Sequence, residues 1–206
     1  MAKKLRTIHN VIVIPEDCSD MDMLKPIISA MITNLGSPRA KIQVYKPSVF
    51  KGISQVLQLK NINKIVDRYE TEADLILLCV DRDADPDTEA KLANLEEKIN
   101  KKLENNQNLK IFLAENAYQE IEVWLLAGLK EFLDTKNFAW QAIRDERDPK
   151  DKYFIPFSKE KGYFDYPNDG RQELAKEAAR NYQRICKMCP EVARLEKKIR
   201  DWLQNT

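Results

Sequence analysis

The chain has a single histidine, His9, among its 206 residues. This scarcity excludes histidine-rich metal sites. It also speaks against Ser-His and Cys-His hydrolases, because His9 precedes an apolar stretch and has no nucleophile motif beside it. There are only five glycines, and none belongs to a Gly-rich phosphate-binding loop. We therefore do not expect ATP hydrolysis by this chain alone, and an enzyme of this composition would rely on carboxylates, lysines or a bound metal.

Cysteine and long apolar runs are also scarce. Of the four cysteines, Cys186 and Cys189 form a Cys-x-x-Cys, but no second pair stands at zinc-site spacing. Small buried thiols in a reducing compartment are the simpler interpretation. No run reaches the length of a transmembrane helix, and the first residues do not resemble a signal peptide. We expect a soluble, cytoplasmic protein without a membrane partner.

Net charge gives little indication of a partner. The 34 Lys and Arg residues and the 33 Asp and Glu residues leave a formal net charge of +1. A strongly basic chain would suggest nucleic acid, and this chain lacks that global signal. Any binding of nucleic acid must therefore depend on a local patch of positive charge.

Apolar runs alternate with amphipathic segments along the first 133 residues. The runs at 10–15, 41–45, 73–80 and 110–114 predict strands, and the segments at 20–35, 52–69, 86–105 and 118–133 predict helices. The third run is apolar throughout, which is typical of a strand covered on both faces. The alternation predicts an α/β fold with a mostly parallel, Rossmann-like four-stranded sheet flanked by helices.

The pattern changes after residue 133. Residues 145–169 are polar and interrupted by prolines, which predicts an irregular segment. Residues 170–204 predict two helical pieces, with Pro190 in the first turn of the second. We therefore divide the chain into an α/β domain, residues 1–133, and a helical C-terminal extension packed on it, residues 134–206.

Carboxylates follow three of the four predicted strands. Because the carboxyl ends of parallel strands share one edge, these side chains should gather there: Glu16, Asp17, Asp20, Asp81, Asp83, Asp85, Glu115, Glu120 and Glu122. Such like charges repel one another unless a cation offsets them. Mg²⁺ is held by one or two carboxylates together with waters and substrate phosphates, so the pattern suits phosphodiester chemistry.

Several of these residues have a simpler structural interpretation. Asp85 and Asp20 are also good helix caps. Arg82 could pair with Glu16 and make part of the cluster purely structural. Glu120 and Glu122 border an apolar helix, where at most one of them can share the side of Trp124. For Asp81 and Asp83, which precede the cap, we favour a site role.

Spacing excludes two better-known acidic sites. A calcium-binding EF-hand starting at Asp81 would need Gly and Glu where the chain has Pro86 and Leu92. A phosphatase of the haloacid dehalogenase type has its acidic motif after the first strand, whereas the Asp-x-Asp here follows the third.

The remaining arrangement resembles the Toprim domain of topoisomerases, bacterial primases and OLD-type nucleases. Its two signatures are read here as Glu16 with Asp20 four residues later, and as Asp81-Arg82-Asp83. The block from Glu120 to Ala127, the later Asp148-Pro149-Lys150 and the Gly170-Arg171 pair are similar to the DUF4276 (RloB-related) family of small Toprim-like proteins. One departure is Asp17, where Toprim proteins usually have glycine.

The resemblance implies a set of roles. Glu16, Asp81 and Asp83 would hold Mg²⁺ or Mn²⁺, with Asp85 as a further ligand. Glu16 would also act as general acid or base, and Glu122 would complete the acidic cluster. Lys150 and Arg171 are candidates for phosphate contacts, and Lys150 is also counted among the catalytic residues. The simpler interpretation is that these basic side chains are only solvated, as exposed Lys and Arg more often are. Asp20 and Glu120 are secondary candidates.

Three functions follow as hypotheses. The first is a Mg²⁺-dependent Toprim-type nuclease that cleaves DNA or RNA, as an effector of a prokaryotic defence or nucleic-acid processing system. The second is a degenerate Toprim-like subunit that binds an ATPase or another protein partner. The third is a receiver-like phosphoacceptor, which would use Asp81 but leaves Asp83 unexplained. A second copy of the chain is a further partner to consider.

Overall fold

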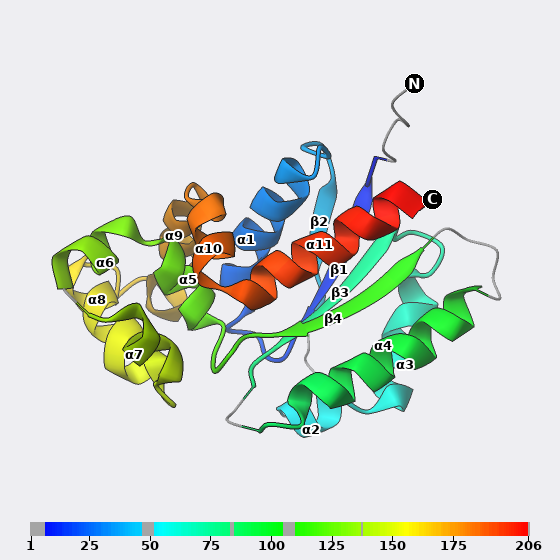
Figure 1. The fold of residues 1–206 in the computed structure, drawn as a ribbon, viewed down its shortest axis with the longest axis horizontal. Helices are drawn as coiled ribbons and strands as arrows, with labels where there is room; N and C mark the ends of the chain where they lie inside the picture. Colours follow the sequence, from blue (N-terminus) through cyan, green and yellow to red (C-terminus); the bar gives the residue numbers. More distant parts are fainter. Residues whose placement is uncertain (1–6, 47–51, 83–84, 105–109, 137, 206) are drawn as a thin grey trace.

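Four parallel strands form a single sheet in the order β2-β1-β3-β4 (Figure 1). The computed structural model describes residues 7–46, 52–82, 85–104, 110–136 and 138–205. The strands are β1 (Asn10–Pro15), β2 (Lys41–Val44), β3 (Leu75–Val80) and β4 (Ile111–Asn116). The α/β architecture expected from the alternation is therefore confirmed, and each described strand pair is parallel.

Helices cover both faces of this sheet (Figure 1). One face packs against α1 (Met21–Asn34), α5 (Glu122–Gly128), α9 (Arg171–Ala179), α10 (Tyr182–Met188) and α11 (Pro190–Asn205). The other face packs against α2 (Ile53–Val56), α3 (Leu59–Tyr69) and α4 (Thr88–Glu104). Within the described ranges, no helix has the length and apolar character needed to cross a membrane.

Alternation along the central strands divides the core into two layers. Val13 and Leu77 belong to the cluster on the α1 side, whereas their neighbours Ile14 and Leu78 belong to the cluster on the α4 side. All six residues of β3 are buried, because both of its faces are covered. This burial fixes the register and therefore fixes where each strand ends.

Residues 130–170, which follow the sheet and α5, contain more helix than the sequence predicted. They contain α6 (Lys130–Lys136), α7 (Trp140–Asp145), a π turn (Lys150–Phe154), α8 (Ile155–Glu160) and a 3-10 turn (Pro167–Gly170). The expectation of an irregular segment at 145–169 is therefore wrong in part. Phe154 and Phe157 are buried and contribute to the core, so packing rather than local preference stabilises these short helices.

Three predicted helical segments are divided differently. The 52–69 segment forms α2 and α3, and the 118–133 segment forms α5 and α6 with a break at Leu129, whose ψ is 89°. The tail forms three helices instead of two. The additional break lies at Asn181, which leaves the helical conformation while its side chain donates a hydrogen bond of 2.8 Å to the Gly128 carbonyl. Pro190 opens α11, as predicted.

The tail helices share a continuous core with the sheet. Leu174 and Ile185 belong to the same buried cluster as Val13 in β1. The division expected after residue 133 falls inside α6. The helical extension is thus packed directly on the sheet.

Side chains from two helices satisfy the backbone along the outer edge of β4. Asn100 accepts a hydrogen bond from the Phe112 amide at 2.9 Å and donates one to the Phe112 carbonyl at 2.8 Å. Glu96 accepts from the Ala114 amide at 2.9 Å, and Lys198 donates to the Ala114 carbonyl at 3.3 Å. Helices α4 and α11 therefore supply the hydrogen bonds that a fifth strand would otherwise make.

The contact between α5 and α9 depends on Gly128. A Cβ at this position would lie 2.6 Å from the Ala178 carbonyl oxygen and 2.7 Å from the Ala178 Cβ. We expect Gly128→Ala to lower the free energy of unfolding by about 1–3 kcal/mol, because the two backbones would have to separate. Urea unfolding measures this loss. Lys60→Ala on the exposed side of α3 is the control, and a loss at Gly128 no larger than at Lys60 would contradict the close packing.

Candidate functional site

Four carboxylates from distant parts of the sequence meet at the carboxyl edge of the sheet. Glu16 lies directly after β1, Asp20 precedes α1, Asp81 follows β3 and Glu122 opens α5. Glu16, Asp20 and Glu122 are 9%, 3% and 3% exposed, and Asp81 is half-buried. We call this group the acidic edge. The parallel sheet brings these residues together because β1 and β3 are neighbours and end side by side.

Direct contacts tie the acidic edge together. The Asp81 amide donates to Glu16 Oε2 at 3.2 Å, which connects the ends of β1 and β3. Asp81 Oδ1 accepts a hydrogen bond of 2.8 Å from the Ile121 amide, just before α5. Asp81 Oδ2 accepts no hydrogen bond from the part of the chain that the structure describes. One oxygen of Asp81 thus positions the carboxylate, and the other remains available for a ligand.

The electrostatics of the acidic edge favour protonation or a bound cation. Burial, together with the charges of Asp17, Glu122 and Glu16, raises the pKa of Asp20 to about 8. Burial and the charges of Asp20, Glu122 and Glu16 likewise raise the pKa of Asp81 well above its ordinary value. With a pKa of about 8, Asp20 therefore holds a proton at neutral pH unless positive charge is brought to the acidic edge.

Arg171 offsets one member of the acidic edge. Its guanidinium donates to Glu122 Oε1 at 2.8 Å and 3.3 Å, and the two side chains are 3% and 4% exposed. Arg171 also lies 3.3 Å from Asp169. The sequence predicted a phosphate contact for Arg171. Its burial gives it a different function, which is to hold the α9 terminus against α5.

Asp17 stabilises the turn after β1. Its Oδ1 accepts hydrogen bonds from the Ser19 amide and hydroxyl, both at 2.6 Å, and from the Asp20 amide at 3.3 Å. Asp17 is exposed and does not have a positive φ. The turn thus forms without the conformational freedom of glycine. Asp17 adds a charge near Asp20 and leaves the backbone path without a positive φ.

The acidic run after β3 separates into two parts. Asp85 lies 2.6 Å from Lys91 and accepts from the Asp87 amide at 2.9 Å, and these contacts lower its pKa. Asp85 thus stabilises the turn before α4 rather than capping the helix itself, and these contacts favour a structural interpretation of Asp85 over its interpretation as a metal ligand. Asp83 lies outside the described residues, so its predicted role stays a prediction.

Glu120 and Lys150 lie beside the acidic edge. Glu120 Oε2 accepts from the Lys150 amide at 2.9 Å. Burial, with a smaller contribution from the charge of Glu122, raises the pKa of Glu120 to about 7, although the hydrogen bond from Lys150 opposes this shift. Lys150 is half-buried and forms no ion pair within the described ranges. The titrating carboxyl of Glu120 thus lies near the positive charge of Lys150.

Two expected participants have structural roles instead. Glu115 lies within β4 and pairs with Arg194 through contacts of 2.6 Å and 2.9 Å. Arg82 stacks on the Tyr118 ring, with its guanidinium carbon 4.9 Å from the ring centroid, and donates to the Asp85 carbonyl. The alternative in which Arg82 neutralises Glu16 therefore receives no support from the position of Arg82.

A buried network behind the site was not predicted from the sequence. Glu191 in α11 accepts from both Arg144 and Trp124, at 3.0–3.1 Å. Arg144 also stacks on Tyr118, which connects α7 to the loop before α5. Arg144 and Glu191 lie 47 residues apart on polar helices, and nothing in the sequence around either residue indicates that the two pair. The network fixes the orientation of α5 and therefore the position of Glu122.

The acidic edge does not form a complete ligand cage by itself. Among the described residues, no group of three or more Asp, Glu, His or Cys side chains is arranged to hold a metal ion. Mg²⁺ commonly uses only one or two protein carboxylates and completes its shell with water and phosphate oxygens. Glu16 and Asp81 are neighbouring carboxylates and could supply such a pair of oxygen ligands.

No protein-family model matches the chain, and no curated protein or solved structure matches it either. The site is therefore interpreted from its own chemistry.

The raised pKa of Asp20 makes stability depend on pH. The folded protein keeps a proton that the unfolded chain releases above about pH 4, so the free energy of unfolding should fall as the pH rises from about 4 to about 8. In EDTA, Asp20→Asn should flatten this fall and raise the free energy of unfolding at pH 8 by about 1–3 kcal/mol. Urea unfolding at several pH values measures both effects.

The exposed Asp145 provides the control for this experiment. Asp145→Asn should leave the slope of stability against pH unchanged. An identical slope in the wild type and in Asp20→Asn would show that Asp20 is not the titrating group.

Proposed function

We propose that this protein is a metal-dependent nuclease of the Toprim type that hydrolyses phosphodiester bonds in DNA or RNA. The observation that carries the proposal is the meeting of Glu16, Asp20, Asp81 and Glu122 at one edge of the parallel sheet. The similarity of the motifs to Toprim-like proteins of the DUF4276 (RloB-related) family adds support. A role as an effector in prokaryotic defence or nucleic-acid processing goes with that similarity.

The donor set suits Mg²⁺ or Mn²⁺. All the candidate ligands are carboxylate oxygens, which hard divalent cations prefer. Glu16 and Asp81 would hold the ion, with Asp20 beside them and Asp83 as the further ligand implied by the sequence. Burial, and then the charges of neighbouring carboxylates, raises the pKa values of Asp20 and Asp81, and a bound cation would favour the ionised form of both. A bound ion supplies Lewis acidity at the phosphate and lowers the pKa of water.

Residues beside the acidic edge are suited to move protons and hold a phosphate. With a pKa raised to about 7, Glu120 can accept and return a proton near neutral pH. Lys150, adjacent to Glu120, can donate hydrogen bonds to a phosphate oxygen. Arg171 acts indirectly by keeping Glu122 in place. In this proposal, one region of the fold would provide metal ligands, a proton-transfer group and an anion contact.

A second function is favoured by one observation. The described carboxylates do not close around an ion, and Asp85 is engaged by Lys91. This arrangement would fit a Toprim-like subunit that has lost catalysis and instead binds an ATPase or another protein partner. The two functions differ in whether the acidic edge binds a metal and supports turnover.

Cleavage assays test the nuclease proposal. Purified protein is incubated with labelled DNA, RNA and tRNA in Mg²⁺ or Mn²⁺. We expect Asp81→Asn and Glu16→Gln to reduce the cleavage rate by at least about 100-fold, because each removes a charge that the reaction requires. Glu120→Gln should reduce it by about 100-fold or more through lost proton transfer.

Asp87→Asn is the matched control, because Asp87 belongs to the same acidic run and is exposed. This variant should cleave at the wild-type rate. Cleavage that survives both Asp81→Asn and Glu16→Gln would place the active site elsewhere.

Metal binding is tested without reference to activity. Addition of about 10 mM MgCl₂ to EDTA-treated protein at pH 8 should raise the melting temperature, because the ion binds the folded state. The same addition to Asp81→Asn should produce a much smaller shift. Equal shifts in the two proteins would contradict the metal site, and calorimetry without detectable binding would favour the degenerate subunit.

A further inference from the structure

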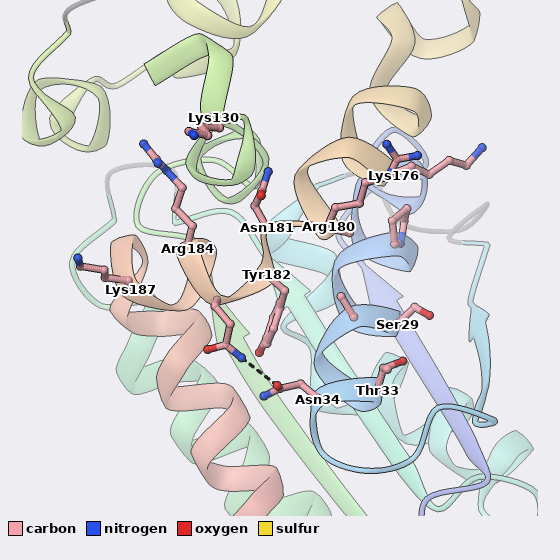
Figure 2. A pocket seen from close by; sticks show the side chains of 14 residues that line it. Ser29, Thr33, Asn34, Lys130, Lys176, Arg180, Asn181, Tyr182, Arg184 and Lys187 are labelled. Atoms are coloured by element: carbon pink, nitrogen blue, oxygen red, sulfur yellow. Dashed lines mark hydrogen bonds between the residues drawn. The ribbon is translucent and has the colours of Figure 1, made fainter. Parts of the chain in front are cut away.

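A large basic groove lies between α1 and α10, away from the sheet edge. Its volume is about 900 Å³, and its walls come from α1, from the end of α9 and from α10. Figure 2 shows Lys187 and Arg184 on one side of the groove and Arg180 and Lys176 on the other, with Tyr182 between them. The groove is distinct from the acidic edge in both position and charge.

All charged residues that line this groove in the described ranges are positive. They are Lys130, Lys176, Arg180, Arg184 and Lys187. In a chain whose formal net charge is only +1, this is a strong local excess. Uncharged polar groups, among them Ser29 and Thr33 of α1, complete the lining. The groove therefore offers cations together with hydrogen-bonding groups, which is the composition that recognises phosphates.

Most of these cations are available for a ligand. Lys130, Arg180 and Lys187 are exposed and form no ion pair within the described part of the chain. Lys176 reaches Glu173 only at 4.0 Å, and Arg184 reaches Asp134 at 3.6 Å. Contacts this long between partly exposed groups contribute little and can be exchanged for a phosphate.

Hydrogen bonds keep the walls of the groove in place. Gln183 donates to Asn34 Oδ1 at 2.8 Å and joins α10 to α1. The dashed line at Asn34 in Figure 2 marks this bond. The hydroxyl of Tyr182 donates to Glu196 at 2.6 Å. These bonds therefore hold α10, which carries Arg184 and Lys187, against α1 and α11.

A smaller hollow lies between the basic groove and the acidic edge. It has a volume of about 330 Å³ and shares Pro26, Ser29 and Lys176 with the groove. Its lining extends to Met21, next to Asp20, and to Gln172, next to Arg171. Lys25 adds a further exposed cation, whereas Asp22 in the same hollow is hydrogen-bonded to Asn168. The two hollows form a path along α1 and α9 toward the acidic edge.

We propose that the basic groove between α1 and α10 binds the sugar-phosphate backbone of nucleic acid and directs the strand along α1 toward the acidic edge. The inference takes its ligand class from the proposed nuclease function. It adds the surface that supplies affinity, which the nearly neutral chain otherwise lacks. Recognition through phosphates makes binding depend on salt and only weakly on sequence.

The test measures binding in EDTA, so that cleavage does not interfere. Fluorescently labelled single-stranded and double-stranded oligonucleotides are titrated with wild-type protein and with Arg180→Glu/Lys187→Glu in about 50 mM salt. We expect the double variant to bind about ten-fold more weakly or worse. The slope of log Kd against log salt should fall by about 2, because two phosphate contacts are lost.

A matched variant and a milder variant serve as controls. Lys60→Glu/Lys64→Glu reverses two exposed charges on α3, on the opposite face of the sheet, and should change Kd by no more than about two-fold. Arg180→Gln/Lys187→Gln removes charge without reversing it and should give an intermediate loss of affinity. Circular dichroism establishes that each variant is folded.

The outcomes separate this inference from the proposed function. Weaker binding by the groove variants alone supports the groove, whether or not the wild type cleaves in Mg²⁺. Wild-type affinity in the folded groove variants overturns the inference while leaving the nuclease proposal intact. The inference is also overturned if the wild type binds no oligonucleotide, or if polyglutamate displaces the oligonucleotide at equal charge concentration, because the groove would then select acidic polypeptide.

Discussion

The buried pair of Glu122 and Arg171 joins the two halves of this structure. Glu122 opens α5 beside the acidic edge, and Arg171 opens α9 in the C-terminal tail. Removal of one partner from such a buried pair typically costs about 3–5 kcal/mol, since the other charge stays in the interior without compensation. The tail is therefore tied to the edge of the sheet by charge as well as by apolar packing. The ion pair also positions α9, whose Lys176 lines both the basic groove and the smaller hollow.

The structure separates positive and negative charge that cancel in the composition. Carboxylates collect at the carboxyl edge of the sheet, and cations collect between α1 and α10. The two regions are connected along α1, so under the proposed function a polyanion held by the cations would approach carboxylates that repel it unless a divalent ion is bound. Metal binding and strand binding would then reinforce one another, because the ion removes the repulsion between the acidic edge and phosphate.

Sequence reasoning succeeded where burial imposes a pattern. The strands were identified because apolar runs such as Leu75–Val80 have few alternatives to a covered sheet, and the meeting of Glu16 with Asp81 followed from parallel topology. The helix breaks were missed because they depend on contacts distant in sequence, such as that of Asn181 with Gly128. Arg171 was assigned to substrate because its buried partner is 49 residues away. The basic groove had a visible signal, since Lys176, Arg180 and Arg184 recur every four residues, but solvated helix faces share that spacing.

The hydrogen bonds that Asn100, Glu96 and Lys198 make to β4 also determine how molecules of this protein can meet. An open parallel strand exposes amides and carbonyls that can pair with a strand from another molecule. Here the backbone groups of Phe112 and Ala114 are already engaged by side chains from α4 and α11. A second molecule that approached β4 would have to displace these side chains before it could add a strand. The fold thus resists edge-to-edge aggregation at β4.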